Sequence, residues 1–245
     1  MDGFRVHDVA ADLAVRATGG MAELSPELDA AVERLWRAAC ARAEAGGAGR
    51  LFNGLVFSAD RFAAHEITGH MTEFRRVVAQ MHDPAMFSAL GLRQFAVCGV
   101  LLCQGGLLIG RRHRDAVYQP GLWQLPPAGS VDGSALRPDG RIDIHAALLA
   151  ELTEELGLPA DAVDAPRPLC VVEHPGSHVC DLGLALHTAL DAEAVLAAHR
   201  AAGNSEYDPL LVVPEAELPD FVAGLGDEIV PPAREFMKRL GLLPA

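Results

Sequence analysis

A chain of 245 residues, half of them apolar and 22% of them charged, is long enough for one large or two modest globular domains. Its formal net charge of −13 argues against nonspecific binding to nucleic acid or to an anionic membrane, because both need a basic surface. An acidic protein that acts on a phosphate compound needs metal ions or local arginines to offset its own field.

The five cysteines predict a reduced, cytoplasmic protein. Their number is odd, none forms a C-x-x-C pair, and Cys98 and Cys103 fall in an apolar run, as expected of core residues. Residues 1–12 include acidic residues where a secretory signal would be basic and then apolar. The apolar run FAVCGVLLC is too short to span a membrane.

Residues 1–92 are predicted to form an α+β extension that precedes the main domain. A helix is expected over 25–45, because Ser25 suits the N-cap, Pro26 suits the first helical position and apolar residues recur at helical spacing. The glycine-rich stretch 46–49 is expected to end this helix. Two roles remain open for the extension, a lid that binds substrate or a surface that forms a homodimer. Its other expected elements are a strand at 4–15, a strand at 51–62 and a helix or strand–helix pair at 65–83.

The pattern changes at residue 93, where a second domain covering 93–245 is predicted to begin. Strands are expected at 93–103 and 107–112, and the turn Gln-Gly-Gly between them indicates a hairpin. A cluster of basic residues at 111–114 follows at once. A loop rich in Pro, Gly and Trp comes next, at 119–133, and its composition favours close approach of the backbone to a ligand.

Strands and covering helices fill the rest of the chain and predict a layered α/β architecture. The polar stretch 133–141 is expected to be an inserted loop. A helix is expected over 144–156, with Asp143 as its N-cap and Gly157 as its C-terminal stop. The later elements are expected as strands at 168–174 and 182–190, a helix at 191–203, a strand at 206–214 and closing helices at 217–225 and 231–241.

Three glutamates of the helix at 144–156 share one face. Glu151, Glu154 and Glu155 stand at positions i, i+3 and i+4, which lie on the same side of an α-helix. Like charges repel, so the arrangement gains from a cation among them, and hard oxygen ligands suit magnesium or manganese. The competing interpretation is an exposed acidic face near a helix end.

The stretch 129–158 resembles the Nudix box, whose pattern is G-x5-E-x7-R-E-U-x-E-E-x-G-U, with U an aliphatic residue. Gly129 takes the place of the family glycine, and an insertion at 133–140 separates it from the helix. Ala150 stands where the family has an arginine. The resemblance covers about residues 93–245 and also includes the order of hairpin, basic cluster, W-x-L-P-x-x-G loop and glutamate helix. The second half of the box is matched at Glu151, Leu152, Glu154, Glu155, Gly157 and Leu158.

The resemblance implies a Nudix α/β/α sandwich with a mixed β-sheet. Within the family the chain is most similar to the UDP-glucose diphosphatase branch. That branch also has an N-terminal region and an insertion before the helix, lacks the box arginine, and has a strand ending in paired arginines followed by a P-G-L loop. The corresponding stretch here is LLIGRRHRDAVYQPGLW.

The resemblance also implies a metal site and a catalytic base. Glu151, Glu154 and Glu155, with the backbone carbonyl of Ala128 or Gly129, are expected to hold magnesium, with manganese as an alternative. The ions would bridge phosphate oxygens and activate a water molecule. The base that takes the proton from this water is expected to be either Glu151 or Glu206, and the sequence leaves both open.

Candidate substrate contacts are Arg111, Arg112, Trp123 and Gly129. Guanidinium groups suit bidentate phosphate binding, although a surface arginine pair at the end of an edge strand is an equal alternative. Trp123 could stack on a base or belong to the core. The histidines at 174 and 178 are four residues apart with Pro and Gly between them, which favours a turn over a zinc pair.

The function implied is magnesium-dependent hydrolysis of a nucleoside diphosphate linked to another group. A nucleotide sugar such as UDP-glucose is the expected substrate, giving a nucleoside monophosphate and a sugar phosphate. ADP-ribose or a nucleoside triphosphate is the alternative substrate. The alternative from another class is a nucleotide-binding module in which loss of the box arginine reflects lost catalysis. The expected partner is a small molecule, with no nucleic acid and no membrane, and a homodimer remains open.

Overall fold

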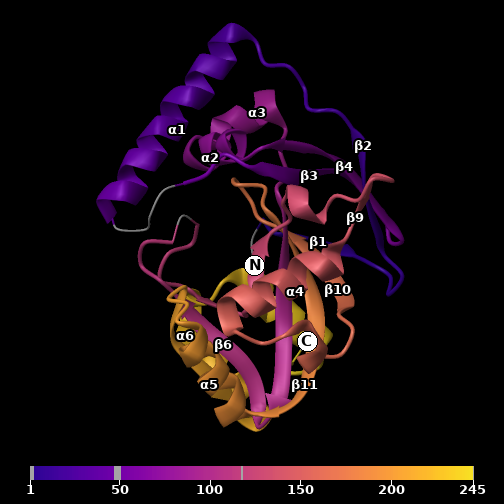
Figure 1. The fold of residues 1–245 in the computed structure, drawn as a ribbon, viewed down its shortest axis with the longest axis vertical. Helices are drawn as coiled ribbons and strands as arrows, with labels where there is room; N and C mark the ends of the chain where they lie inside the picture. Colours follow the sequence, from indigo (N-terminus) through magenta and orange to yellow (C-terminus); the bar gives the residue numbers. More distant parts are fainter. Residues whose placement is uncertain (1–2, 47–50, 117, 245) are drawn as a thin grey trace.

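The computed structural model describes residues 3–46, 51–116 and 118–244, and it is a mixed α/β structure built on two sheets (Figure 1). This confirms the predicted fold class. Strand β11 pairs with β5 in parallel, whereas the other neighbours in this sheet are antiparallel, so the sheet is mixed. The larger sheet has the order β1 (Arg5–Asp8), β10 (Arg167–Glu173), β11 (Cys180–Asp191), β5 (Phe95–Gln104), β6 (Gly106–Arg112), β12 (Tyr207–Val213), with β7 (Trp123–Gln124) beside β6 and β8 (Ala128–Ser130) beside β5.

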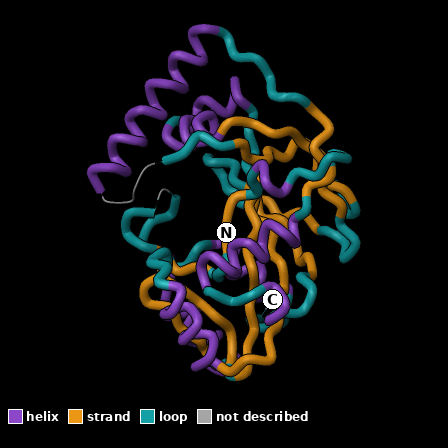
Figure 2. Tube along the Cα trace, in the orientation of Figure 1, coloured by secondary structure: helices purple, strands orange, loops and turns teal. Residues whose placement is uncertain are grey.

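The smaller sheet has the order β3-β4-β2-β9, and it lies next to the helices α1 to α3 at one end of the molecule (Figure 2). Its strand β9 begins at the last residue of the stretch expected to be an inserted loop, and it pairs with β2. The bounds are β2 (Ala14–Gly19), β3 (Leu55–Phe62), β4 (Glu66–Glu73), β9 (Arg141–Ile142), α1 (Pro26–Gly46), α2 (Phe74–His82) and α3 (Phe87–Leu90).

The two sheets exchange strands across the boundary expected at residues 92 and 93. Strand β1 belongs to the first part of the sequence but pairs with β10 of the larger sheet. Strand β9 belongs to the second part but pairs with β2 of the smaller sheet. The segment 4–15 was expected to form one strand. It forms two strands instead, because β1 and β2 join different sheets. The helix expected over 25–45 and the strand–helix pair expected at 65–83 are confirmed, whereas residues 47–50 of the glycine-rich stretch lie outside the described residues.

The larger sheet is covered on both faces. Residues of β5 alternate between two cores, with Val97 and Leu101 in one and Cys98 and Val100 in the other. The first core includes apolar residues of α4 and α5, and the second includes residues of α6 and α7, so the β-sheet lies between two helical layers. These helices are α4 (Ile144–Leu156), α5 (Ala192–Ala202), α6 (Leu218–Leu225) and α7 (Pro231–Arg239).

The hairpin β5–β6 turns at Gly105 and Gly106, whose φ angles of 118° and 147° favour glycine. Four of the five cysteines are buried, as expected, and Cys40 is half-buried, with no disulfide among the described residues. Within the described part of the chain no helix is both long and apolar enough to cross a membrane.

Candidate functional site

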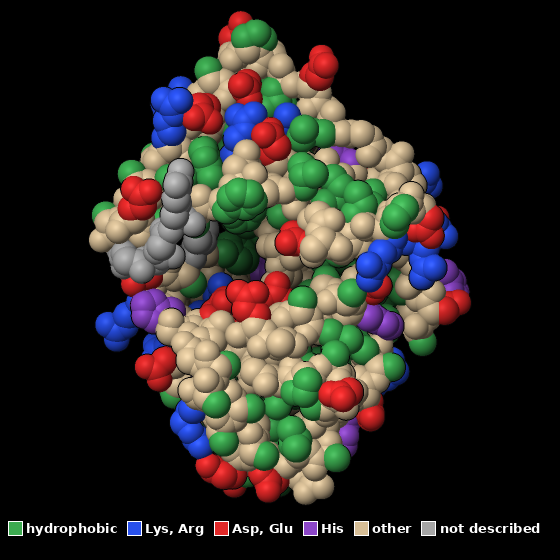
Figure 3. Space-filling view, viewed as in Figure 1, with side chains coloured by type: hydrophobic (Ala, Val, Ile, Leu, Met, Phe, Trp, Pro, Cys, Tyr) green, Lys and Arg blue, Asp and Glu red, His purple; other side chains and the backbone are tan. Residues whose placement is uncertain are grey.

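A cavity of about 800 Å³ opens between the glutamate helix α4, the strands β5 and β8, and helix α2. Figure 3 shows a hollow in the middle of one face of the molecule, with acidic side chains gathered along its rim. The residues of this cavity come from both parts of the sequence, because Phe74 and Met81 belong to α2. Among the predicted site residues, those that line the cavity are Arg112, Gly129, Glu151 and Glu206.

Helix α4 begins and ends where the sequence predicts. The side chain of Asp143 accepts a hydrogen bond from the backbone N–H of Ala146 at 2.9 Å, which satisfies an unpaired donor of the first turn. Gly157 ends the helix in the left-handed conformation, with φ of 66°. The apolar stripe faces the core and fixes the rotation of the helix, which turns Glu151 and Glu155 toward β8. The fully buried residues of this stripe are Leu148, Leu152 and Leu156.

Glu155 is a buried carboxylate with one oxygen that lacks a partner. The residue is 1% exposed, and its Oε2 accepts a hydrogen bond from the backbone N–H of Ala128 at 2.9 Å. Its Oε1 has no hydrogen-bond partner among the described residues. Burial, followed by the charges of Glu206 and Glu151, raises the pKa of Glu155 well above its usual range. A buried, unpaired carboxylate oxygen is costly, so this position suits a cation.

Glu151 lies directly against Gly129 of β8. A Cβ atom at position 129 would lie 1.9 Å from Oε1 of Glu151, so any larger residue there would displace this carboxylate. Burial, followed by the charges of Glu154, Glu206 and Asp132, raises the pKa of Glu151 to about 7. The residue at 150 is an exposed alanine, and the contact shown for the Glu151 carboxylate is with the backbone at Gly129.

The carboxylates of Glu151, Glu154 and Glu155 suit a hard divalent cation. Carboxylates that crowd together under burial raise one another's pKa, and a cation among them removes the repulsion. Glu154 is exposed, whereas Glu151 and Glu155 are not, so the three glutamates differ in their access to solvent. In the described ranges no three His, Cys, Asp or Glu side chains already stand in a metal-binding arrangement.

Arg112 and Glu206 meet on the wall of the cavity. Nη2 of Arg112 lies 3.5 Å from Oε1 of Glu206, and Nε of Arg112 donates to the carbonyl of Tyr118 at 3.2 Å. Nη1 of Arg112 donates to Oε1 of Gln124. The backbone of Glu206 is held at both sides, since its carbonyl accepts from the N–H of His113 at 2.8 Å and its own N–H donates to Asn204 at 2.7 Å.

Arg111 and Trp123 lie outside the lining of this cavity. Consecutive residues of a strand point to opposite faces, so Arg111 faces away when Arg112 faces the cavity. Its Nε donates to the carbonyl of Gly121 at 2.9 Å, and its Nη2 donates to Glu228 at 3.1 Å. Trp123 is opposite Arg111 in the β6–β7 register and shares its face; its ring is 8% exposed and packs edge-on against Phe221.

The two histidines at 174 and 178 belong to a turn, and each has its own carboxylate. The N–H of His178 donates to the carbonyl of His174 at 3.1 Å across the turn. Nε2 of His174 lies 2.7 Å from Asp181, and Nδ1 of His178 lies 2.8 Å from Glu173. The turn interpretation therefore fits this arrangement better than a shared zinc ion.

Several residues that line the cavity were not predicted from the sequence. Gln124 follows Trp123 in β7 and faces the opposite way, but it lies in the stretch where the sequence predicts a loop. The others come from distant elements and carried no local signal. These residues are Phe74, Met81, Gln94, Tyr118, Asp132 and Asp181.

No family model matches the sequence, and no curated protein matches it. The fold is similar to a NUDIX hydrolase from Alicyclobacillus acidocaldarius, with 16% identity over 61% of this chain and 90% of that one, and a TM-score of 0.42. It is similar to a MutT NUDIX hydrolase from Burkholderia pseudomallei, with 19% identity over 60% of this chain and 96% of that one, and a TM-score of 0.40.

A third similar structure is a bifunctional NMN adenylyltransferase/ADP ribose pyrophosphatase from Francisella tularensis, in complex with AMP and a manganese ion. The identity is 14% over 66% of this chain, and the TM-score is 0.43. This chain spans about half of that protein, covering 47% of it.

Proposed function

We propose that the chain is a divalent-metal-dependent hydrolase of the Nudix type, which cleaves the diphosphate bond of a nucleoside diphosphate linked to another group. The observation that carries this proposal is the buried Oε1 of Glu155, which has no partner among the described residues, close to the carboxylate that lies against Gly129. Glu151 lines the cavity of about 800 Å³, a volume in the usual range for small-molecule sites, and Glu155 lies behind the lining residue Ala128, from whose N–H it accepts a hydrogen bond.

The proposed metal ligands are the carboxylates of Glu151, Glu154 and Glu155, with the backbone carbonyl of Ala128 or Gly129. Magnesium suits this donor set, and manganese is the alternative. An ion bound there would neutralise charge on the phosphates and lower the pKa of a water molecule. Glu155 is fixed for this role by the N–H of Ala128, which leaves its second oxygen available.

The side chain of Arg112 is the proposed phosphate contact. Its guanidinium lines the cavity and is oriented by the carbonyl of Tyr118, so it can offer N–H groups to a phosphate without losing its support. We propose Glu206 as the base that accepts the proton of the attacking water, because its carboxylate reaches the cavity and is 37% exposed. Glu151 is the alternative base, although its contact with Gly129 favours metal binding.

A nucleotide sugar such as UDP-glucose is the proposed substrate, on the strength of the resemblance to the UDP-glucose diphosphatase branch. Phe74 and Met81 of α2 line the cavity, and this favours a substrate-binding role of residues 1–92 over a purely dimer-forming one. ADP-ribose is the competing substrate. A binding module without turnover is the competing class, and the exposed Ala150 in place of the family arginine favours it.

A substrate panel with magnesium tests the proposal. UDP-glucose, ADP-ribose and a nucleoside triphosphate are each incubated with the protein, and both products are identified. The proposal predicts UMP and glucose 1-phosphate from UDP-glucose, with Ala150→Arg remaining active. Loss of Glu154 or Glu155 as a metal ligand (Glu154→Gln, Glu155→Gln) is expected to lower kcat/KM at least about 100-fold, because metal stabilisation of the transition state is worth several kcal/mol. Tight binding of all three compounds without turnover would favour the binding module instead.

A further inference from the structure

We infer that Asp181, oriented by His174, binds hydroxyl groups of the substrate, and that the group seated against it is a neutral sugar ring rather than a phosphate. The inference rests on the proposed function and specifies one part of its substrate. It starts from the position of Asp181 in the cavity lining, on a strand remote from the glutamate helix.

The register of three strands places Asp181 on the same face of the sheet as Ser130 of β8, whereas Gly129, against which Glu151 lies, is the adjacent residue and faces the other way. Asp181 of β11 is opposite Ala96 of β5, and Ala96 is opposite Ser130 of β8. Residues directly opposite each other project from the same face of a sheet, and all three line the cavity. Two strand spacings separate Asp181 from Ser130, which is about 10 Å. The Asp181 carboxylate therefore lines the same cavity as Glu151 but lies apart from it, on the other face of the sheet.

His174 fixes the orientation of Asp181. Nε2 of His174 lies 2.7 Å from Oδ2 of Asp181, and the Nε2 amide of Gln119 lies 3.4 Å from Nδ1 of the same ring. An amide NH₂ is a donor, so Nδ1 accepts and the ring proton on Nε2 is donated to the carboxylate. Among the described residues no hydrogen bond reaches Oδ1 of Asp181, so this oxygen can accept from a ligand.

The imidazole of His174 is held rigidly. The residue is 3% exposed, and two aromatic rings contact it edge-on. The centroid of Phe4 lies 5.0 Å away at an interplanar angle of 66°, and that of Tyr118 lies 5.6 Å away at 74°. A carboxylate backed by a fixed donor cannot turn aside when a ligand enters, so its charge is part of the recognition surface.

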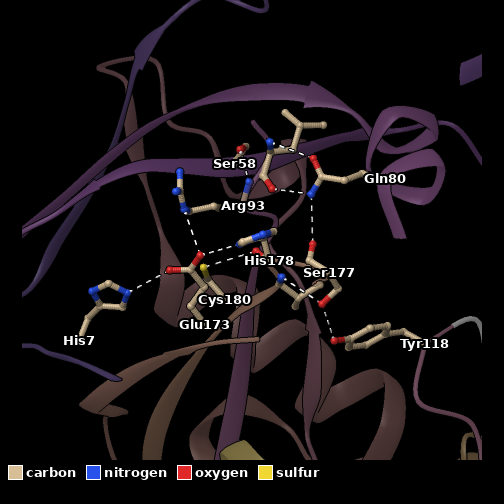
Figure 4. A network of polar contacts seen from close by, with 11 residues as sticks. His7, Ser58, Gln80, Arg93, Tyr118, Glu173, Ser177, His178 and Cys180 are labelled. Carbon is tan, nitrogen blue, oxygen red and sulfur yellow. Dashed lines mark hydrogen bonds and ion pairs between the residues drawn. The ribbon is translucent and has the colours of Figure 1, made fainter. Parts of the chain in front are cut away.

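Contacts across both parts of the chain also fix the turn that carries His174. In Figure 4, Glu173 lies between His7, Arg93 and His178, with distances of 3.4, 3.2 and 2.8 Å to its oxygens. The hydroxyl of Tyr118 lies 2.8 Å from that of Ser177 (Figure 4). This wall is therefore assembled before a ligand arrives, which reduces the entropy lost on binding.

The chemistry of the wall selects against a phosphate. An ionised carboxylate repels a phosphate group, and the side chain of Asp181 is only 14% exposed, so water screens this repulsion poorly. The neighbouring lining residues Gln94, Ser130 and Tyr118 are neutral hydrogen-bonding groups. Gln94 and Ser130 already bond to each other and Tyr118 bonds to Ser177, and a ring that bears hydroxyls can add hydrogen bonds to these groups, since each hydroxyl both donates and accepts. The ring is either the sugar of the leaving group or the ribose of the nucleoside.

The test compares three compounds with the same diphosphate. They are UDP-glucose, its analogue with a 2′,3′-dideoxyribose, and a uridine diphosphate propyl ester, which has no sugar on the leaving group. For Asp181→Asn we expect kcat/KM with UDP-glucose to fall about 10-fold or more, because a hydrogen bond to a charged acceptor is replaced by a weaker one to a neutral amide. If Asp181 binds the leaving-group sugar, the substitution should lower kcat/KM for the propyl ester less than about 2-fold. If Asp181 binds the ribose, kcat/KM for the dideoxy analogue should be the one that the substitution leaves unchanged.

An equal loss with all three compounds would overturn the inference, because it indicates a purely structural role for Asp181. An unchanged kcat/KM with all three would overturn it as well. The control is Asp220→Asn, which removes one negative charge from an exposed position of α6 and should leave all three compounds unaffected.

Calorimetric binding separates this inference from the proposed function. If the wild-type protein hydrolyses none of the compounds, the proposed function fails, and dissociation constants then decide the role of Asp181. The inference predicts that Asp181→Asn weakens the binding of UDP-glucose. The loss of affinity should be about 10-fold larger than for the analogue that lacks the contacted hydroxyls. Equal dissociation constants in the wild-type and variant proteins would contradict it.

Discussion

Gly129 provides the space that Glu151 occupies, and a single methyl group tests this fit. In Gly129→Ala the new Cβ would lie 1.9 Å from Oε1 of Glu151, so the carboxylate must move. We expect magnesium-dependent turnover to fall about 100-fold or more. A shift of a metal ligand by about 1 Å is enough to disrupt a catalytic arrangement. The control is Gly224→Ala, where the added Cβ meets nothing within 4 Å. Wild-type activity and metal affinity in Gly129→Ala would contradict this account.

Glu155 predicts a pH-dependent stability of the metal-free protein. Its pKa is raised in the folded state, so the folded protein is favoured while the carboxyl is protonated, and stability falls as pH rises through the folded-state pKa. In the presence of a chelator, Glu155→Gln should therefore melt at a higher temperature than the wild type at pH 8. The difference should shrink toward pH 5, where the wild-type carboxyl is protonated as well. A lower Tm of the variant at pH 8 would indicate that the charge is already compensated without metal.

Helix α4 shows which parts of an element a sequence determines. Its caps, its apolar stripe and its three glutamates are local features, and the sequence predicted all of them. The sequence did not predict which of Arg111 and Arg112 points into the cavity, because this depends on which face of β6 meets the cavity. The pairing of Arg111 with Trp123 fixes both on the far face, and this pairing joins residues from two separate elements.

Replacing Glu173, the last residue of β10, is expected to lower the stability of the protein strongly. Glu173 is 3% exposed and contacts the basic groups of Arg93, His178 and His7. Replacement by alanine leaves these groups without their carboxylate, and breaking a buried ion pair costs about 3–5 kcal/mol. Urea unfolding measures this loss of unfolding free energy.

The matched comparison for Glu173 is an exposed ion pair. Asp8 is paired with Arg239 at 2.6 Å, but its side chain is 78% exposed. Asp8→Ala should cost less than about 1 kcal/mol, because water and salt screen such a pair. If the two alanine variants unfold at the same urea concentration, the contacts of Glu173 contribute no more than a surface pair.

At the scale of the whole molecule, the exchange of strands joins the two parts of the sequence. The pairs β1–β10 and β2–β9 connect residues more than one hundred positions apart, and no local pattern predicts such pairing. A fragment of residues 93–245 loses β1 from the larger sheet and exposes buried Phe95, which packs on Phe57. We expect this fragment to aggregate or to lack a cooperative thermal transition. A soluble fragment with a sharp transition would indicate that residues 93–245 fold alone.

The central claim is that the buried glutamates of α4 bind a metal that the reaction needs. The most direct test is the rate of UMP and glucose 1-phosphate release from UDP-glucose, measured against magnesium concentration for the wild type and for Glu155→Gln. The account predicts saturable dependence on magnesium, loss of turnover with a chelator, and a decrease of at least about 100-fold in the variant. Turnover that persists with a chelator, or that is unchanged in Glu155→Gln, would contradict it.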